Sequence, residues 1–255
     1  MSKRRHAFSP KYRPRGLNIL YEDGDILVID KEEGLLTMSP RRDESRTAER
    51  YLTHYLRKGA SRSRLRVFVV HRLDRETSGV LVFAKSALAQ RRLKDDWKNT
   101  EKFYLAAVHG HPSPKSGVIT SYLAEDDDQF VRSVPESAKG RFAKTAYSVI
   151  RETPALSILK VQLLTGRKNQ IRVHFAEKGH PVVGDSKYGQ RGRPGARMAL
   201  HAMSIAFCHP RSGLRMRFET PIPDLFRRLG GGAIDKDWAG STLNAPSAYP
   251  YRSTD

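Results

Sequence analysis

Short apolar runs separated by polar residues follow one another along most of the chain, and they predict many strands and few helices. Two such runs, residues 17–22 and 26–30, are separated by Asp23-Gly24-Asp25. Glycine adopts a positive φ at little cost, so Asp-Gly between apolar runs predicts a β-hairpin. In residues 156–164 apolar and polar side chains alternate, as they do in a strand with one buried face.

The remaining pattern predicts a mixed fold. We expect helices at residues 47–56, 86–99, 168–178 and 223–229, the second capped by Ser86 and the third ended by Gly179. Further strands are expected at residues 67–70, 80–84, 103–108, 118–122, 143–151, 203–208 and 214–220. Hairpin-rich strands with few helices predict an α+β fold with a large, mostly antiparallel mixed sheet, flanked by helices and loops.

Composition divides the chain into three parts. Residues 1–16 form a basic arm with six Lys/Arg and no acid. Residues 17–230 hold the predicted strands and helices and form the main domain. Residues 231–255 are rich in Gly, Ser, Pro and Ala, and we expect this tail to be loosely ordered or wrapped on the surface.

Charge is the strongest global signal. The 255 residues include 46 Lys/Arg and 27 Asp/Glu, a formal net charge of +19. Residues 41–75 alone carry eleven Lys/Arg against four acids. A field of this sign attracts polyanions, and nucleic acid is the polyanion that we expect as partner. An anionic membrane surface is the rival, but the pattern contains no long amphipathic helix to support it.

Other features limit the class of protein. No apolar run approaches the roughly 20 residues that cross a bilayer, so we expect no membrane partner. The basic N-terminus lacks the apolar segment of a secretory signal. The single cysteine, Cys208, excludes an intramolecular disulfide and a multi-cysteine zinc site. A cytoplasmic location is the expectation.

One candidate for chemistry is the segment HRLDRETSG, in which Asp74 stands between Arg72 and Arg75. Neighbouring guanidiniums favour the charged form of a carboxylate, which serves as nucleophile, base or ion-pair partner. A structural role for Asp74, in which it caps the loop and pairs with Arg75, stays open. Ser78 is a weaker candidate because no G-x-S-x-G surrounds it. A kinase is excluded, because a glycine-rich phosphate loop and D-F-G are missing.

A second candidate segment is LLTGRKNQIRVHFAEKGHPVVGDSKYG, residues 163–189. Arg167 stands at the start of the expected helix, where a phosphate would meet backbone N–H groups. Arg172 lies five residues further on, on a different side of that helix. His174 and His180 are six residues apart, a spacing that fits no zinc-ligand pair, so we expect them to pack or to face RNA and expect no metal.

Together these segments carry a family resemblance. HRLDRETSGVLVFAK, TGRKNQIRVHFAEKGHPVVGDSKYG and LHAMSIAF resemble the signature blocks of the RluA-type pseudouridine synthases. LNILYEDGDILVIDKEEGLLT and EKFYLAAVHG resemble other blocks of that family, in the family's order. The resemblance implies the pseudouridine synthase fold. It also implies isomerisation of uridine to pseudouridine in RNA, with no cofactor and no metal.

The resemblance also implies catalytic residues. Asp74 corresponds to the family's essential aspartate, Tyr104 to the tyrosine that stacks on the base, and Arg172 to the arginine that pairs with the aspartate. Stacking on an aromatic side chain contributes roughly 1–3 kcal/mol per base. Alternative interpretations stay open for two of them, Tyr104 as a core tyrosine and Arg172 as a surface arginine on a helix.

Three further residues are expected to bind the substrate. By resemblance Arg72 holds the flipped nucleotide or the gap that it leaves, and Leu200 lines the uracil pocket, although it is equally well explained as a core residue. Arg167 is expected to contact phosphate. Extracting a uridine from its stack costs a few kcal/mol, which contacts in a pocket offset.

The sequence departs from the family pattern in three places. Lys31-Glu32-Glu33-Gly34 stands for the usual Lys-Pro-x-Gly, and residues 166–170 read Gly-Arg-Lys-Asn-Gln for Gly-Arg-Thr-His-Gln. The second change puts contacts to the aspartate loop in doubt. Many relatives carry an N-terminal S4 RNA-binding domain, and we expect none here, because only the basic arm precedes the first block.

The expected partner is RNA, and we favour ribosomal over transfer RNA because an extended basic arm suits a large folded target. We expect a monomer. One alternative is a non-catalytic RNA-binding or ribosome-assembly protein on the same fold. A basic nuclease or DNA-binding protein is a weaker alternative, because the sequence lacks the clustered carboxylates of a two-metal site.

Overall fold

The computed structural model describes residues 16–39, 46–58, 60, 62–189, 196–241 and 243. It separates into two compact units. Unit 1 comprises residues 1–102 and 200–221, and unit 2 comprises residues 103–199 and 222–255. The basic arm up to residue 15 and most of the tail beyond residue 241 lie outside the described residues.

Unit 1 is built on a sheet with the strand order β1-β2-β4-β10. These strands are β1 (Leu17–Glu22), β2 (Ile26–Lys31), β4 (Ser78–Ala84) and β10 (Leu200–Cys208). The short β3 (Phe68–Val69) pairs with β4, and β11 (Arg215–Glu219) pairs with β10. The predicted hairpin is confirmed, and Asp23 Oδ1 closes its turn by accepting from the N–H groups of Asp25 and Ile26, both at 2.8 Å.

Helices of unit 1 begin at hydroxyl caps, of which the one at Ser86 was predicted. Ser86 Oγ accepts from the N–H of Ala89 at 3.1 Å and starts α2 (Ala87–Asp95). Thr47 caps α1 (Ala48–Arg57) in the same way. The expectation of one helix through residue 99 was wrong in detail, because α2 ends at Asp95 and a 3-10 helix, η2 (Trp97–Asn99), follows. Buried residues of α2 join a core cluster with β2, β4 and β10: Ile26, Val28, Val70, Val80, Val82, Ala84, Ala89, Leu93, Ile205 and Phe207.

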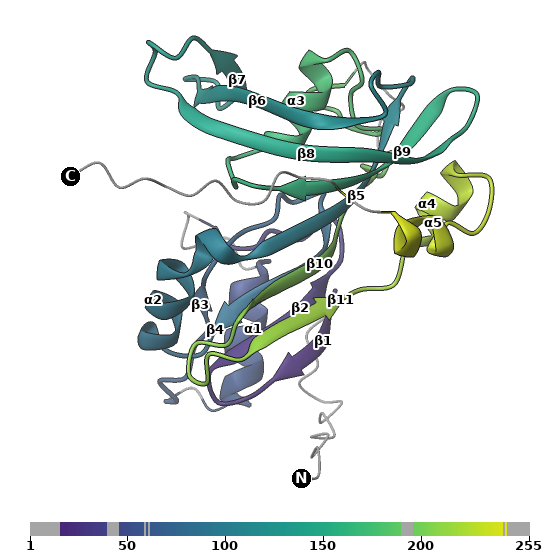
Figure 1. Ribbon diagram of the computed structural model, residues 1–255. Coiled ribbons are helices and arrows are strands. Elements are labelled where there is room, and N and C mark those ends of the chain that lie inside the picture. Colours follow the sequence, from purple (N-terminus) through teal and green to yellow (C-terminus); the bar gives the residue numbers. More distant parts are fainter. Residues whose placement is uncertain are drawn as a thin grey trace. The chain divides into compact units, whose positions relative to one another are not determined.

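Unit 2 holds an antiparallel sheet with the order β5-β9-β8-β6-β7. Its strands are β5 (Glu101–His109), whose first two residues belong to unit 1, β6 (Ser116–Glu125), β7 (Val131–Val134), β8 (Arg141–Glu152) and β9 (Leu156–Leu163). Helix α3 (Gln170–Glu177) packs along β6, β7 and β8 (Figure 1), where Leu123, Val131, Ala143 and Val173 form a core cluster. The sequence pattern did not predict β7, which has only four residues.

Two short helices follow in the described part of unit 2, α4 (Asp224–Leu229) and α5 (Asp235–Gly240). The second lies in the segment that we expected to be a tail. Ile234 and Trp238 are buried, and Asp237 pairs with Arg151 of β8 at 2.6 Å. Residues 235–240 are therefore packed and helical, which corrects the expectation of loose order for this part of the tail.

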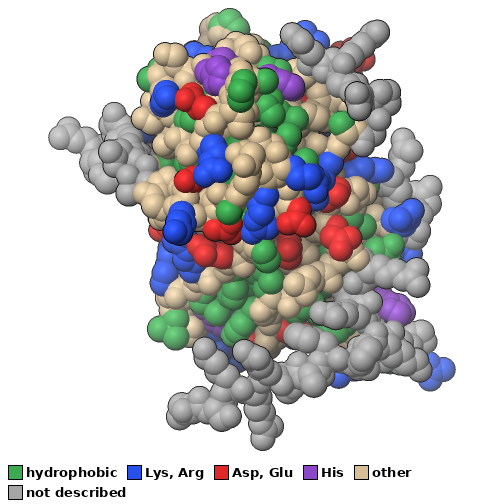
Figure 2. Space-filling model, turned by 90° about the vertical axis from the view of Figure 1, so that its right-hand side faces the viewer, with side chains coloured by type: hydrophobic (Ala, Val, Ile, Leu, Met, Phe, Trp, Pro, Cys, Tyr) green, Lys and Arg blue, Asp and Glu red, His purple; other side chains and the backbone are tan. Residues whose placement is uncertain are grey.

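The fold class agrees with the prediction. Helices flank mixed, mostly antiparallel strands, and the pairing of β4 with β10 is parallel. On the face shown in Figure 2, basic and acidic side chains are interspersed. Among the described residues, no helix is long and apolar enough to cross a membrane.

The parallel pairing of β4 with β10 depends on Gly79. It has a φ of +113°, and a Cβ on it would lie 2.2 Å from the carbonyl oxygen of Ala202. We expect Gly79→Ala to lower the free energy of unfolding by about 3 kcal/mol or more, because it adds both backbone strain and a backbone clash. Gly24→Ala is the control, since nothing lies within 4 Å of its Cβ position. Urea unfolding measures both, and equal stability of the two variants would contradict the explanation.

Candidate active site

The loop that carries Asp74 is held in place through its backbone, which the side chain of Thr37 binds. Thr37 Oγ1 accepts from the N–H of Leu73 at 3.1 Å and donates to its carbonyl oxygen at 2.9 Å. Leu73 is buried, whereas Arg72 and Arg75 are exposed and Asp74 is half-buried. The N–H of Thr77 donates to the carbonyl of Asp74 at 3.2 Å and closes a turn. The loop thus holds Asp74 in a fixed turn, with guanidiniums on both sides of it in the chain.

A buried lysine supports the same loop. The side chain of Lys31 is fully buried, and its ammonium donates to the carbonyls of Glu32, Leu35 and Arg75 at 2.9, 2.9 and 3.2 Å. All three N–H groups of the ammonium therefore have acceptors. Burial lowers the pKa of Lys31 to about 8, and the carboxylate of Asp74 is the largest of the charges that act in the opposite direction. Lys31 connects the strand β2 to the Asp74 loop by both hydrogen bonds and charge.

His71 begins the loop as a neutral ring. Burial, followed by the charge of Lys102, lowers the pKa of His71 to about 3. Its Nε2 accepts from the N–H of Val82 at 3.0 Å, which fixes the proton on Nδ1. The ring lies 4.8 Å from the ring of Trp97. These contacts give His71 a structural role at the base of the loop.

The end of the loop is joined to β10 by a buried polar chain. Ser78 Oγ lies 2.7 Å from Nδ1 of His201, and Nε2 of His201 lies 2.8 Å from Oγ1 of Thr220. Ser78 is thus a structural residue of the β4–β10 pairing. His201 is opposite Ser78 in the parallel register, so the buried Leu200 lies beside the end of the Asp74 loop. This position suits the pocket-lining role expected for Leu200 as well as a core role.

Arg172 is buried in unit 2 and paired with an aspartate. Its Nε and Nη2 donate to the two carboxylate oxygens of Asp185 at 2.7 and 2.8 Å, and Nη1 donates to Asn169 Oδ1 at 3.3 Å. Only 6% of Arg172 is exposed, so its interpretation as a surface arginine was wrong. Burial raises the pKa of Asp185, but hydrogen bonds and charge from Arg172 outweigh it and hold that pKa below the usual value. The pairing of Arg172 with Asp74 stays a prediction.

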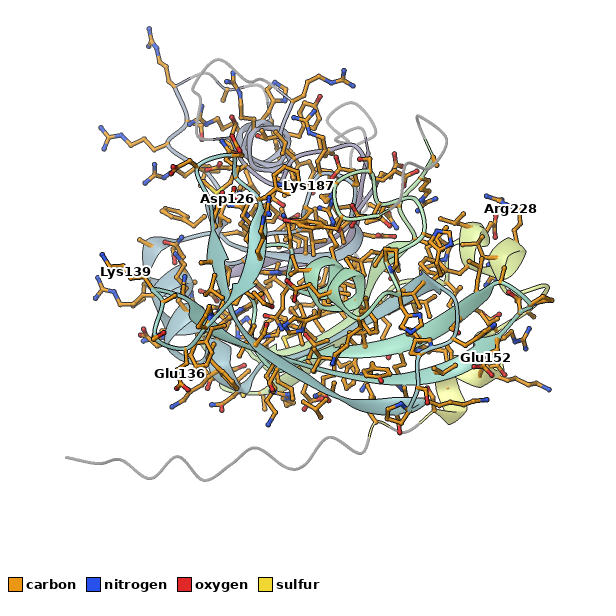
Figure 3. All side chains as sticks on the ribbon, turned by 90° about the horizontal axis from the view of Figure 1, so that it is seen from above. Asp126, Glu136, Lys139, Glu152, Lys187 and Arg228 are labelled. Carbon is orange, nitrogen blue, oxygen red and sulfur yellow. The ribbon has the colours of Figure 1, made fainter. Side chains whose placement is uncertain are left out.

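The turn after Asp185 completes this cluster. Asp185 Oδ1 also accepts from the backbone N–H groups of Lys187 and Tyr188, and the Tyr188 ring lies 5.2 Å from the Arg172 guanidinium carbon. The hydroxyl oxygen of Tyr188 accepts a hydrogen bond from the backbone N–H of Val131 at 3.0 Å. Lys187 Nζ donates to the carbonyl of Gln129, in the acidic turn that begins at Asp126 (Figure 3). The segment GDSKYG therefore fixes the orientation of the Arg172 guanidinium.

Two further predicted site residues belong to unit 2. Tyr104 lies on β5 opposite Val161 of β9, and 8% of it is exposed, so a core role and a base-stacking role both stay open. Arg167 precedes α3, which begins at Gln170 and not at residue 168 as predicted. Its Nε donates to the carbonyl of Phe142 at 2.8 Å, and the guanidinium is half-buried.

Two of the three departures from the family pattern have local explanations. Glu32, where the pattern has proline, uses its N–H to donate to the carbonyl of Gly16 at 3.1 Å, a bond that proline lacks. Asn169 adopts a φ of 54°, a left-handed conformation that asparagine tolerates, and its amide contacts Tyr188 and Arg172. Asn169 thus takes part in holding Arg172.

A group with metal-ligand geometry exists elsewhere in unit 1. Ligand atoms of Asp23, Asp25 and His209 lie within 4.8 Å of one another. These atoms already have partners: Asp23 accepts from backbone N–H groups and from His209, and Asp25 holds Arg211 bidentately at 2.7 and 2.9 Å. These hydrogen bonds connect the first hairpin to the β10–β11 turn, which explains the group, and we assign it no metal.

Comparisons with known proteins identify the family. The family model for RNA pseudouridylate synthase matches residues 25–177. The chain belongs to the RNA pseudouridylate synthase family.

Relatives and solved structures support this membership. An uncharacterized RNA pseudouridine synthase of Bacillus subtilis, YjbO, is 34% identical over 85% of this chain and 76% of its own length. The ribosomal large subunit pseudouridine synthase D of Neisseria meningitidis is 35% identical over 86% of this chain, but only 61% of its own length is matched. Human RNA pseudouridylate synthase domain containing 1 has a TM-score of 0.65 at 27% identity, covering 83% of this chain and 85% of that one.

Sequence reasoning did not find several residues that restrain the predicted site residues. Lys31 and Thr37 precede the Asp74 loop by some 40 positions, and a lysine in a strand is expected to be exposed. Asp185 lies in the quoted family block, residues 163–189, together with Arg172. A carboxylate in the same block as a predicted site arginine was the signal that could have indicated their pairing. Asp74, Arg72 and Leu200 belong to unit 1, whereas Tyr104, Arg167 and Arg172 belong to unit 2. A common site for all six stays a prediction from the resemblance.

Removing the Lys31 ammonium tests the support of the Asp74 loop. We expect Lys31→Met to lower the free energy of unfolding by about 3 kcal/mol at neutral pH, because three buried carbonyls lose their donor. The wild type should gain stability relative to this variant as pH rises from about 8 to 10.5, because the unfolded chain then binds more protons at Lys31 than the folded chain does. Lys98→Met, at an exposed position, is the control. Urea unfolding that shows the same stability and pH dependence for both variants would refute the role of Lys31.

The Arg172–Asp185 pair gives a prediction at acid pH. We expect Asp185→Asn to lower the free energy of unfolding by about 3 kcal/mol near neutral pH, because it leaves a buried guanidinium without its anion. The pKa of Asp185 in the folded protein lies below its usual value of 3.8, so the stabilisation by Asp185 is present above that pH and is lost as pH falls further. The difference between wild type and variant should therefore shrink in acid. Glu219→Gln breaks an exposed pair and should change stability by less than about 1 kcal/mol.

Proposed function

We propose that this synthase isomerises specific uridines with Asp74 as its catalytic carboxylate. The observation that carries the proposal is the construction of the Asp74 turn. Thr37 fixes the backbone at Leu73, Lys31 binds the carbonyl of Arg75, and Asp74 remains half-buried between these anchors. A catalytic group needs such fixed placement, because misplacement by about 1 Å reduces the rate strongly.

The reaction breaks the bond between N1 of uracil and C1′ of ribose and forms a bond between C5 and C1′. The C5 hydrogen leaves as a proton and N1 gains one, so that product and substrate are isomers and no oxidant or reductant is required. Asp74 acts on the base, on the sugar carbon or on a ribose proton. Each of these roles requires its ionised form.

We propose that the other predicted residues bind and position the flipped nucleotide. Tyr104 offers an aromatic face to the uracil, Leu200 an apolar wall, and Arg72 a cation beside Asp74. Arg172 acts as a positioning residue for the Asp74 carboxylate. Its restraint by Asp185 at Nε and Nη2 and by Asn169 at Nη1 supports this role, because a guanidinium held in this way has a defined direction for further bonds. Arg167, before α3, contacts phosphate.

Ribosomal RNA is the proposed substrate, ahead of transfer RNA. The net charge of +19 and the arm of six cations suit a large RNA, and one matched relative is named as a ribosomal large subunit synthase. We propose that the enzyme works as a cytoplasmic monomer. A non-catalytic RNA-binding protein on this fold is the second candidate, favoured by the same charge.

Tritium release from C5-labelled uridine tests the proposal. Wild type should release tritium from one RNA pool, ribosomal or transfer, whereas Asp74→Asn should release none and still bind RNA with unchanged salt dependence. Asp95→Asn, at an exposed position of α2, is the matched control and should behave as wild type. Release by Asp74→Asn at the wild-type rate would refute the catalytic assignment. Absence of release by wild type from both pools would favour the non-catalytic candidate.

A further inference from the structure

A groove lies beside the catalytic loop, entirely within unit 1. It has a volume of about 410 Å³ and is lined by residues 66–72, by Met38 and Glu49, and by Gln90 and Lys94 of α2. Ligand-binding clefts commonly have volumes of roughly 300–1,000 Å³. Gln90 of α2 donates to the carbonyl of Val69 at 2.7 Å and fixes the helix against the groove floor. The groove is therefore a built feature of helix, strand and loop, and its wall continues into the loop that carries Asp74.

The groove is lined by cations that lack anionic partners. Its lining includes Arg66, Arg72 and Lys94, against the single acid Glu49. Within the part of the chain that the structure describes, no salt bridge is formed by any of these three cations. Arg211 of unit 1, by contrast, is neutralised by Asp25 at 2.7 Å. Unpaired cations that converge on one groove are suited to phosphate groups.

The same groove offers surfaces on which a base can stack. The guanidinium carbon of Arg66 lies 4.6 Å from the centroid of the Phe68 ring, and both residues line the groove. Proteins recognise single-stranded RNA by stacking bases on aromatic rings and guanidinium planes next to cations that bind phosphate. The combination points to a nucleotide and not to a lone anion.

The distance along the chain places the groove next to the reacting centre. Arg72 lines the groove and is two residues from Asp74, so their Cα atoms lie at most about 7 Å apart. A nucleotide in the groove would therefore be a close neighbour, along the RNA strand, of a uridine held at Asp74.

We propose that this groove binds an unpaired nucleotide that flanks the target uridine, with its phosphates on Arg66, Arg72 and Lys94 and its base against Phe68 and Arg66. The inference rests on the proposed function for the place of the target, but binding in the groove requires no catalysis. It makes an unpaired neighbour a part of the substrate specificity.

Binding of a short fluorescein-labelled oligouridylate, followed by anisotropy, tests the phosphate contacts. The double variant Arg66→Gln/Lys94→Gln should weaken binding about tenfold and reduce the slope of log Kd against log salt by roughly 1.4, since each single-strand contact contributes about 0.7. Lys98→Gln, which removes an exposed cation outside the groove lining, is the control for charge alone. The proposal would be overturned if the loss of binding per charge removed were the same for Lys98→Gln as for the double variant.

Stacking is tested with Phe68→Leu, which keeps an apolar side chain against the core. This variant should weaken oligouridylate binding about fivefold and should not affect an abasic oligomer with the same phosphates. An equal loss for both oligomers, or no loss for either, would overturn the nucleotide assignment. Thermal unfolding of each variant, at or near the wild-type midpoint, shows that a loss comes from the groove and not from the fold.

Kinetics separate this inference from the proposed function. Groove variants should raise KM for tritium release about tenfold and change kcat little, because the groove holds a neighbour of the reacting nucleotide. If wild type releases tritium but the groove variants have the same KM as the control Lys98→Gln, the groove substitutions have no specific effect. The groove inference then fails and the proposed function stands. If wild type releases none but the oligouridylate results follow the prediction, the function fails and the groove remains a nucleotide site.

Discussion

The geometry around Asp74 depends on one buried ammonium. Lys31 ends the second strand of the first hairpin and satisfies three carbonyls, one of which belongs to the residue that follows Asp74. A buried ammonium is costly unless it is fully hydrogen-bonded and its charge is compensated. Both requirements constrain the loop. The carbonyls must face Lys31, and Asp74 must be near enough to influence its pKa. Hairpin and loop are therefore placed together, although more than 40 residues separate them.

In both units, hydrogen bonds and close packing restrain the segments that carry the candidate residues. In unit 1 the glycine at 79 allows β4 and β10 to approach closely, and the polar chain from Ser78 to Thr220 joins the end of the loop to β10. In unit 2 Asp185 binds one edge of the Arg172 guanidinium with both carboxylate oxygens, and the following turn closes around that pair. Preorganisation of this kind reduces the reorganisation that a reaction requires. The groove beside the same loop is our proposed site for a flanking nucleotide of the RNA.

The sequence predicted the strands, the helix caps and the family blocks well, because these depend on local periodicity and turn chemistry. The cap at Ser86 is an example, and so is the first hairpin, although Asp23 closes its turn and Gly24 has no positive φ. It did not reveal Lys31, whose burial depends on carbonyls distant in the chain, or the helix α5, whose short pattern is surrounded by glycine. Arg172 was predicted with Asp74 as its partner, and the structure adds Asp185, a contact that periodicity does not encode. Long-range polar contacts are the part that one sequence leaves open.

Mapping pseudouridine at single-nucleotide resolution tests the central claim most directly. RNA would be taken from cells that lack this protein and from the same cells supplied with wild type or with Asp74→Asn, then treated with carbodiimide and read by reverse transcription. The account predicts that one or more ribosomal uridines stay unmodified without the protein, and that wild type restores the modification while Asp74→Asn does not. Restoration by Asp74→Asn, or an unchanged pattern in cells that lack the protein, would contradict it.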